Sequence, residues 1–184
     1  MKYQIAAVAS VAIALFAEKA NAVPCKALVM SGGANRGAWE VGVIWGLAHY
    51  GNPSDYYWDV ISGISAGAIN TAGTAGWTPE EVLEMTEYLS DAWNGLFTED
   101  IWKLRPLPGA LNIFNEESIL DDSAALETIR EIMSVKSEYG RRVTASALDI
   151  GSGEFVQWNQ TNTNYYDFGQ AGLSSGSIPI AFPP

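Results

Sequence analysis

The chain has 184 residues, of which 48% are hydrophobic and 17% charged, a balance that indicates a globular protein and excludes a disordered one. Acidic residues outnumber basic residues by 21 to 10, so the formal net charge is −11. This charge repels phosphate backbones and anionic membrane surfaces, which argues against nucleic-acid binding. One cysteine and one histidine exclude an internal disulfide and a multi-histidine site, and no metal or cofactor is expected.

Residues 1–22 are predicted to be a secretory signal peptide. Lys2 supplies the basic start, a run of 13 apolar or small residues extends from Ile5 to Ala17, and Ala20-Asn21-Ala22 fits the small-x-small cleavage pattern. The run is too short to span a bilayer comfortably, and a buried N-terminal helix is the alternative. We therefore expect a mature chain that begins near Val23, in a secreted protein or in the lumen of the secretory pathway.

Secretion bears on two further residues. Cys25 is a lone thiol that could stay free, pair with another chain, or lack its partner in this sequence. Asn159-Gln160-Thr161 is the only N-x-S/T acceptor for N-glycosylation in the chain, with an unmodified asparagine as the alternative.

Strands and helices are predicted to alternate in the first part of the mature chain. Strands are expected over Lys26–Met30 and Tyr57–Ser62, and helices over Ala38–Tyr50 and directly after Gly67. Both strands are short apolar runs that end in turn residues. This β-α-β-α order predicts an α/β fold with a parallel sheet covered by helices.

The rest of the chain continues the α/β pattern. Thr78-Pro79-Glu80-Glu81 is a strong helix start with a capping box. The segment Leu96–Phe114 combines bulky apolar residues with two closely spaced prolines and is predicted to be a loop or lid, although its side chains could simply pack on the core. A further helix is expected over Glu116–Ser134. Two strands are expected over Arg142–Ile150 and Glu154–Trp158, joined by a hairpin turn at Gly151-Ser152-Gly153.

The first glycine cluster, Gly63-Ile64-Ser65-Ala66-Gly67, is a G-x-S-x-G motif between a predicted strand and a helix of small residues. In a nucleophile elbow the serine occupies a strained turn, and Gly63 and Gly67 let the backbone pass closely. The start of the helix favours developing negative charge. We therefore expect Ser65 to be a nucleophile, with an ordinary βα turn as the alternative.

The second cluster, Ser31-Gly32-Gly33-Ala34-Asn35-Arg36-Gly37, exposes backbone N–H groups between a strand and a helix. Such groups form an oxyanion hole for a tetrahedral acyl intermediate. A dinucleotide-binding loop is the alternative, but Ala34 occupies its second glycine position, and the second strand leads into the serine turn instead of an acidic residue. The oxyanion interpretation is therefore favoured.

A serine nucleophile needs a base. No histidine follows Ser65, which excludes the Ser, acid, His order of α/β-hydrolases. His49 precedes the serine at the predicted end of a helix, where it interacts with the helix dipole. A Ser–Asp dyad remains, in which a carboxylate accepts the serine proton directly.

The two motifs, Ser31–Gly37 and Asp59–Asn70, resemble those of the patatin-like phospholipases, and so do Ala147–Glu154 and the Ser-Ser-x-x-x-Pro segment Ser174–Pro184 near the active site. The resemblance implies a three-layer α/β/α domain over residues 26–184 and lipid acyl hydrolysis, phospholipase A-like, by a Ser–Asp dyad. It implies a lipid substrate at a membrane or lipid-droplet surface, and Leu96–Phe114 is then expected to cover or flank the lipid site. It carries over Ser65 as nucleophile, and it assigns the oxyanion loop to Gly32, Gly33, Ala34, Arg36 and Gly37.

The sequence departs from the family pattern at two points. Ala34 stands where the family has a third glycine, and no aspartate matches the family's catalytic Asp-Gly motif. Asp149 lies at a strand end and is interpreted as structural. We therefore expect a serine lipid acyl hydrolase domain that is incomplete at its C-terminus; the alternative is a non-catalytic relative that binds or stores lipid.

Overall fold

The computed structural model describes residues 24–104, 118–179 and 181–182. Its strands are β1 (Ala27–Met30), β2 (Val60–Ile64), β3 (Lys103–Leu104), β4 (Leu120–Asp121), β5 (Arg142–Leu148) and β6 (Phe155–Asn159). The main sheet has the order β1-β2-β5-β6, in which the first three strands are parallel and β6 returns antiparallel to β5. β3 and β4 form a separate antiparallel pair. The sheet is therefore mostly parallel, as the strand–helix alternation predicts.

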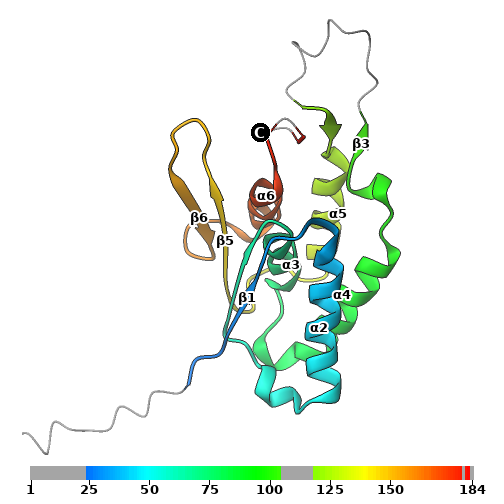
Figure 1. Cartoon of the computed structure of the whole chain (residues 1–184). Helices are drawn as coiled ribbons and strands as arrows, with labels where there is room; N and C mark the ends of the chain where they lie inside the picture. Colours follow the sequence, from blue (N-terminus) through cyan, green and yellow to red (C-terminus); the bar gives the residue numbers. More distant parts are fainter. Residues whose placement is uncertain (1–23, 105–117, 180, 183–184) are drawn as a thin grey trace, which may run out of the picture.

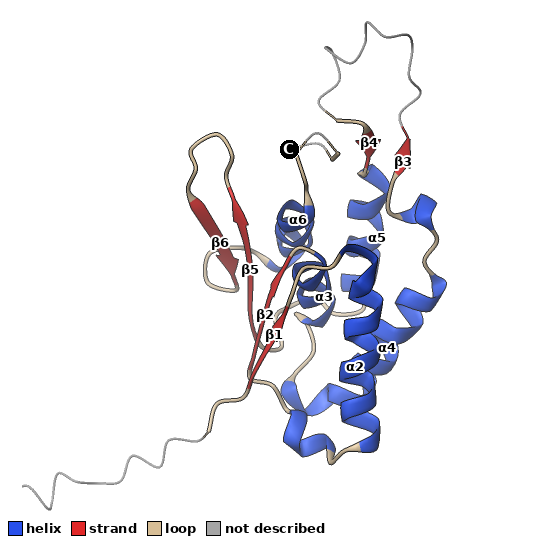
Figure 2. Ribbon diagram, viewed as in Figure 1, coloured by secondary structure: helices blue, strands red, loops and turns tan. Residues whose placement is uncertain are grey.

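Helices connect these strands and cover the sheet. The α-helices are α2 (Gly37–Tyr50), α3 (Ala66–Thr74), α4 (Val82–Gly95), α5 (Ser123–Met133) and α6 (Tyr165–Gly176), and the 3-10 turns are η1 (Ala34–Arg36), η2 (Pro53–Tyr56), η3 (Pro79–Glu81) and η4 (Thr98–Asp100). α3 and α6 lie next to the strands, and α2, α4 and α5 lie beyond them on the same side (Figures 1 and 2). No helix within the described ranges is long and apolar enough to cross a membrane.

The core lies between the sheet and these helices. Ile61 of β2 and Val143 and Ala145 of β5 are fully buried, and Val143 and Ala145 pack in one cluster with residues of α3, α5 and α6. Ile61 belongs to a second cluster that includes residues of α2 and α4. On the opposite face of the sheet, side chains such as Val29 are exposed. The α/β fold is thus confirmed. The described helices pack on one face of the sheet, so the second helical layer of the expected three-layer arrangement is not seen within the described residues.

The capping box predicted at Thr78 is confirmed. The Thr78 N–H donates to the Glu81 carboxylate at 2.8 Å, and the Lys136 ammonium lies 2.7 Å from the same carboxylate. The pKa of Glu81 is held below its usual value, mainly by the hydrogen bond from Lys136 and secondly by that from the Thr78 N–H.

Several boundaries differ from the sequence predictions. The strand expected over Tyr57–Ser62 begins at Val60, since the N–H of Trp58 closes a turn on Tyr56. The helix expected from Glu116 begins at Ser123, because Leu120–Asp121 pairs with β3 instead. The hairpin over Gly151-Ser152-Gly153 is confirmed. Helix α6 is not among the elements that the sequence predicts, although it packs against α3 and contacts the turn at Ser65.

Candidate active site

Ser65 occupies a strained turn between β2 and α3. Its backbone angles are φ 54° and ψ −125°, and apart from Ala34 it is the only non-glycine residue of the described chain with a positive φ. Such a conformation costs about 1–3 kcal/mol and persists only where the surroundings enforce it. The Ser65 carbonyl accepts hydrogen bonds from the N–H groups of Ala68 and Ile69, so the turn caps α3. This geometry is that of the predicted nucleophile elbow.

Gly63 and Gly67 make the turn possible because the backbone segments touch there. A Cβ atom at Gly63 would lie 2.0 Å from the Gly67 carbonyl oxygen, and one at Gly67 would lie 2.5 Å from the Met30 carbonyl oxygen. The Gly67 N–H also donates to the Ser31 carbonyl at 3.2 Å. The motif glycines therefore bring β1, β2 and α3 together beneath Ser65.

The predicted oxyanion loop lies beside Ser65. A Cβ atom at Gly32 would lie 3.5 Å from the Ser65 Oγ, so this position faces the hydroxyl directly. Gly33 and Ala34 line the same cavity as Ser65. Arg36 and Gly37 lie on the helical side of the loop, where the Arg36 N–H closes a turn on Gly33 and Gly37 packs, buried, against Trp93.

Ala34 carries backbone strain that the family glycine would avoid. Its φ is 51°, in the left-handed region that costs a residue with a Cβ about 1–2 kcal/mol. We expect Ala34→Gly to raise the free energy of unfolding by about 0.5 kcal/mol, because the relief of strain exceeds the added chain entropy of glycine. Urea denaturation measures this, with Ala38→Gly in the first turn of α2 as the matched control, which should instead lose about 0.5–1 kcal/mol. Equal losses in both variants would contradict the strain argument.

A hydrogen-bond network that runs from the exposed Ser31 to the buried Asn70 supports the loop. The Glu40 carboxylate accepts from the Ser31 N–H at 2.9 Å and from the Ser31 hydroxyl at 3.2 Å. The Asn70 amide donates to the Gly37 carbonyl at 3.0 Å and to Glu40 at 3.3 Å, and accepts from the Trp93 indole N–H at 2.9 Å. Three helices therefore fix the start of the loop, and satisfied networks of this kind rigidify a site.

The sequence motifs did not reveal this supporting network. Its members are single polar residues on different helices, and no spacing relates Glu40 to Asn70 or Trp93. One signal was present: Asn70 is a polar residue within a run of small apolar ones, and such a residue is expected to have partners when it is buried. At 2% exposure it has three.

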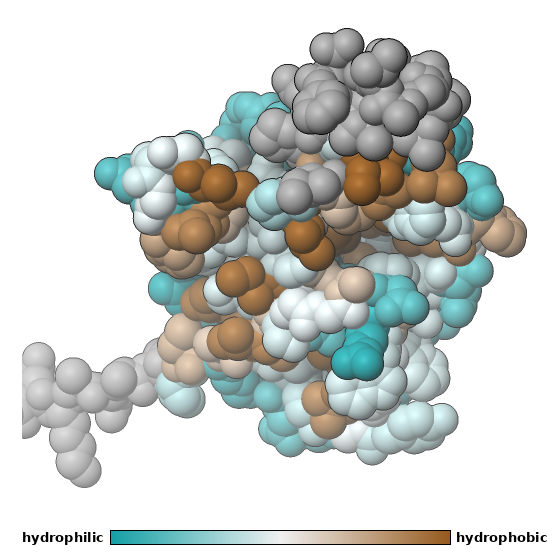
Figure 3. Space-filling view, turned by 45° about the horizontal axis from the view of Figure 1, so that its top comes forward, coloured by the Kyte–Doolittle hydropathy of each residue, from teal (hydrophilic) through white to brown (hydrophobic). Residues whose placement is uncertain are grey.

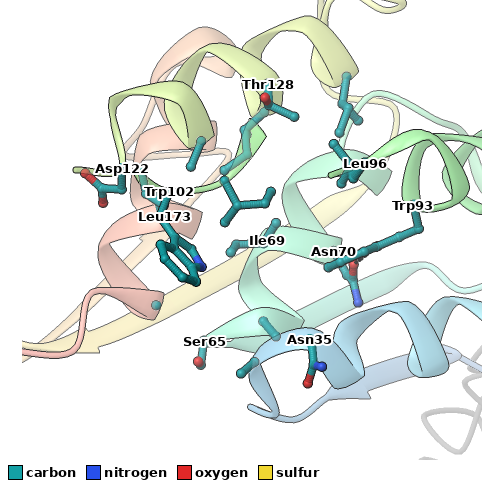
Figure 4. A pocket seen from close by; sticks show the side chains of 18 of the residues that line it. Asn35, Ser65, Ile69, Asn70, Trp93, Leu96, Trp102, Asp122, Thr128 and Leu173 are labelled. Carbon is teal, nitrogen blue, oxygen red and sulfur yellow. Dashed lines mark hydrogen bonds between the residues drawn. The ribbon is translucent and has the colours of Figure 1, made fainter. Parts of the chain in front are cut away.

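A cavity of about 730 Å³ opens beside Ser65 and extends between the helices (Figure 4). Its walls are mostly apolar and include Ile69 and Gly73 of α3, Leu89 and Trp93 of α4, Ile129 and Ile132 of α5, and Leu173 of α6. Pockets of this size and lining bind small apolar ligands. Ser65 and Asn35 lie at one end of this space, below the apolar side chains, in the view of Figure 4.

The predicted loop segment borders this cavity. Leu96, Phe97, Ile101 and Trp102 line it, so the first part of the segment borders the cavity, and its contact with lipid stays a prediction. The segment is not a loop throughout, because it contains the 3-10 turn η4 and the strand β3, which pairs with β4. Residues 105–114 lie outside the described residues. Figure 3 turns the carboxyl ends of the strands toward the reader and shows apolar side chains gathered on this face of the molecule.

The carboxylate partner predicted for Ser65 is not found among the described residues. The Ser65 hydroxyl makes no hydrogen bond to a carboxylate within those residues, whereas the Asp149 carboxylate accepts from the N–H groups of Ser152 and Gly151 in the β5–β6 turn. These bonds hold the pKa of Asp149 below its usual value and agree with its interpretation as structural. Asp167 bonds to Asn164 at the start of α6.

Two other titratable residues are placed by the structure. His49 lies at the far end of α2 from the loop, stacked on Trp45 and 3.4 Å from the Glu87 carboxylate, as expected of a structural histidine. Asp122 is the one acidic residue among the described residues that line the cavity, and it lies across that space from Ser65 (Figure 4).

Comparison with known proteins identifies the family. The model of the patatin-like phospholipases matches residues 28–184. The chain belongs to the patatin-like phospholipase family. This assignment agrees with the resemblance of both glycine motifs and with the fold that surrounds them.

Two solved structures are similar to this patatin-like chain. The ExoU–SpcU complex of the type III secretion system of Pseudomonas aeruginosa gives 20% sequence identity and a TM-score of 0.47, over 86% of this chain and 37% of that one. VipD of Legionella pneumophila gives 15% identity and a TM-score of 0.44, over 87% and 43%. The chain thus spans about two fifths of the length of either protein. The search of curated proteins found no match.

Proposed function

We propose that Ser65 is the nucleophile of a serine acyl hydrolase that cleaves fatty-acyl esters of lipids. The observation that carries the proposal is the position of Ser65, on a strained turn next to a glycine-rich loop and at the end of an apolar cavity. Family membership supports a lipid substrate and hydrolase activity. We place the acyl chain in the cavity and the ester carbonyl between Ser65 and the loop.

The proposed reaction has two balanced steps. The Ser65 Oγ attacks the carbonyl carbon while its proton passes to a carboxylate, and the N–H groups of Gly32, Gly33 and Ala34 stabilise the oxyanion. The alcohol leaves with that proton and an acyl-enzyme remains. Water then attacks the acyl carbon and gives one proton to the same carboxylate. That proton returns to the Ser65 Oγ as the bond between Oγ and the acyl carbon breaks, which releases the fatty acid and restores the serine hydroxyl.

We propose an aspartate of an Asp-Gly motif as this carboxylate. The test compares the 184-residue chain with a longer form that carries such a motif, using a p-nitrophenyl acyl ester and a fluorophosphonate probe. The longer form should turn over the ester and be labelled at Ser65, and the short chain should do little of either. Absence of labelling and turnover in both, with lipid binding retained, would instead favour a non-catalytic lipid-binding protein.

Trp102 provides a test of the lipid substrate. Because its indole lines the cavity, Trp102→Ala should lower turnover of aggregated phospholipid about 10-fold and turnover of a short soluble ester much less. Trp39→Ala is the matched control, since this indole is 71% exposed on α2 and should affect neither substrate in this way. Equal losses on both substrates in Trp102→Ala would favour a packing role.

We further propose that the protein is secreted after cleavage near Val23 and meets its substrate at a membrane or lipid-droplet surface. Residues 1–22 lie outside the described residues. The apolar side chains exposed at the carboxyl end of the sheet, among them Ile64, Leu148 and Phe155, suit contact with uncharged lipid. N-terminal sequencing of secreted protein tests the cleavage: material that retains Met1 would contradict it.

A further inference from the structure

We propose that Ser175, near the C-terminus of α6, is a positioning residue that holds the nucleophile turn through the backbone of Ser65. The Ser65 N–H donates to the Ser175 Oγ at 2.7 Å, and the Ser175 hydroxyl donates to the Ser146 carbonyl of β5 at 2.5 Å. A hydroxyl has one proton to donate and lone pairs to accept. Ser175 uses both capacities here, so its hydroxyl is oriented by the turn at Ser65 and by β5.

The bridge lies where the sheet can no longer hold Ser65 by itself. β2 and β5 pair in register as far as Ile64 and Ser146. At Ser65 the chain turns away from β5 into α3, so the Ser65 N–H is not part of the hydrogen bonding between β2 and β5. The Ser175 hydroxyl connects the Ser65 N–H to the Ser146 carbonyl and so links the end of β2 to β5 beyond their last paired residues.

The two ends of the Ser65 backbone are therefore held by different helices. Its carbonyl accepts from the first turn of α3, and its N–H is held by α6. A positive φ is not the relaxed state of a serine, and without Ser175 one of these two restraints is lost. Because small displacements of a nucleophile lower the rate of chemistry strongly, we expect Ser175 to affect catalysis more than substrate affinity.

The chain offers a closely matched set of variants. Ser175→Ala removes the bridge, and Ser175→Thr retains a hydroxyl in the same place. Ser174→Ala is the control, since the neighbouring Ser174 hydroxyl is exposed and donates only to the Gln170 carbonyl within α6. All three change one side chain on the same helix, and circular dichroism and thermal unfolding show whether each variant folds.

The first test is independent of catalysis. Hydrogen exchange of the Ser65 amide, followed by NMR on the 184-residue chain, should be slow in the unsubstituted protein, in Ser174→Ala and in Ser175→Thr. In Ser175→Ala we expect it to be about 10-fold faster or more, with core amides such as that of Val143 unchanged. An unchanged Ser65 exchange rate in a folded Ser175→Ala variant would overturn the proposal.

The second test rests on the proposed function and uses a form that hydrolyses an acyl ester. Ser175→Ala should lower kcat about 10- to 100-fold with KM within about twofold, and Ser175→Thr should restore most of the loss. An equal fall in Ser174→Ala, or no fall in Ser175→Ala, would overturn the positioning role. Failure of the unsubstituted protein to hydrolyse any ester would defeat the proposed function, and the exchange measurement would still decide on Ser175.

Discussion

Replacing Ser65 with alanine is expected to lower acyl-ester turnover by about 10⁴-fold or more in a form of the protein that carries the catalytic carboxylate. The reason is that the covalent intermediate cannot form without the Oγ, and the oxyanion loop and cavity alone leave little residual rate. Steady-state assays with a p-nitrophenyl ester and labelling with a fluorophosphonate probe measure the loss. Ser62→Ala in β2, three residues before Ser65, is the matched control and should retain its activity.

The same substitution should scarcely change the 184-residue chain. The proposed base belongs to an Asp-Gly motif, and these 184 residues contain no Asp-Gly pair. Because residues that act as a unit lose their effects together, a serine without this base should behave almost like an alanine. Strong Ser65-dependent turnover by this chain would contradict the argument for an absent base. Asp122, the acidic residue that lines the cavity, would then be the first candidate to substitute.

The position of Ser65 was predictable because local chemistry determines it. A serine between glycines at a strand–helix junction leaves few backbone solutions, and the structure has the turn at that residue. The same holds for the loop that ends in Gly37. In contrast, the supports of both features come from distant parts of the chain: Ser175 is 110 residues from Ser65, and Trp93 is 23 residues from Asn70. Periodicity and motifs carry no information about such tertiary partners.

The fold shows a similar division. The apolar runs at β1, β2 and β5 and the capping box at Thr78 predicted their elements because each signal is local. Helix α6 was missed because its three glycines lower helix propensity, whereas packing against α3 and α5 stabilises it. The late start of α5 has the same origin, since Leu120 and Asp121 find strand partners at β3 that the sequence pattern cannot reveal.

Gly63→Ala is expected to lower the free energy of unfolding by about 4 kcal/mol, a loss reserved for severe steric conflicts. The added Cβ would lie 2.0 Å from the Gly67 carbonyl oxygen and 2.5 Å from the Thr71 hydroxyl, both in the first turns of α3. Neither group can yield unless the helix moves away from β2, and that movement displaces Ser65. Urea denaturation measures the stability, and the same variant should have lost ester turnover at temperatures where it remains folded.

Gly42→Ala separates this steric effect from a general effect of replacing glycine. Apart from its chain neighbours and the nearby backbone of α2 itself, no described heavy atom lies within 4 Å of a Cβ built at Gly42, in the interior of that helix. Alanine there should therefore raise the free energy of unfolding by about 0.5–1 kcal/mol. The two Gly→Ala variants should therefore shift stability in opposite directions. If Gly63→Ala unfolds at the same urea concentration as Gly42→Ala, then the contact between β2 and α3 is looser than the 2.0 Å approach requires, and the turn must hold Ser65 by the hydrogen bonds to its backbone instead.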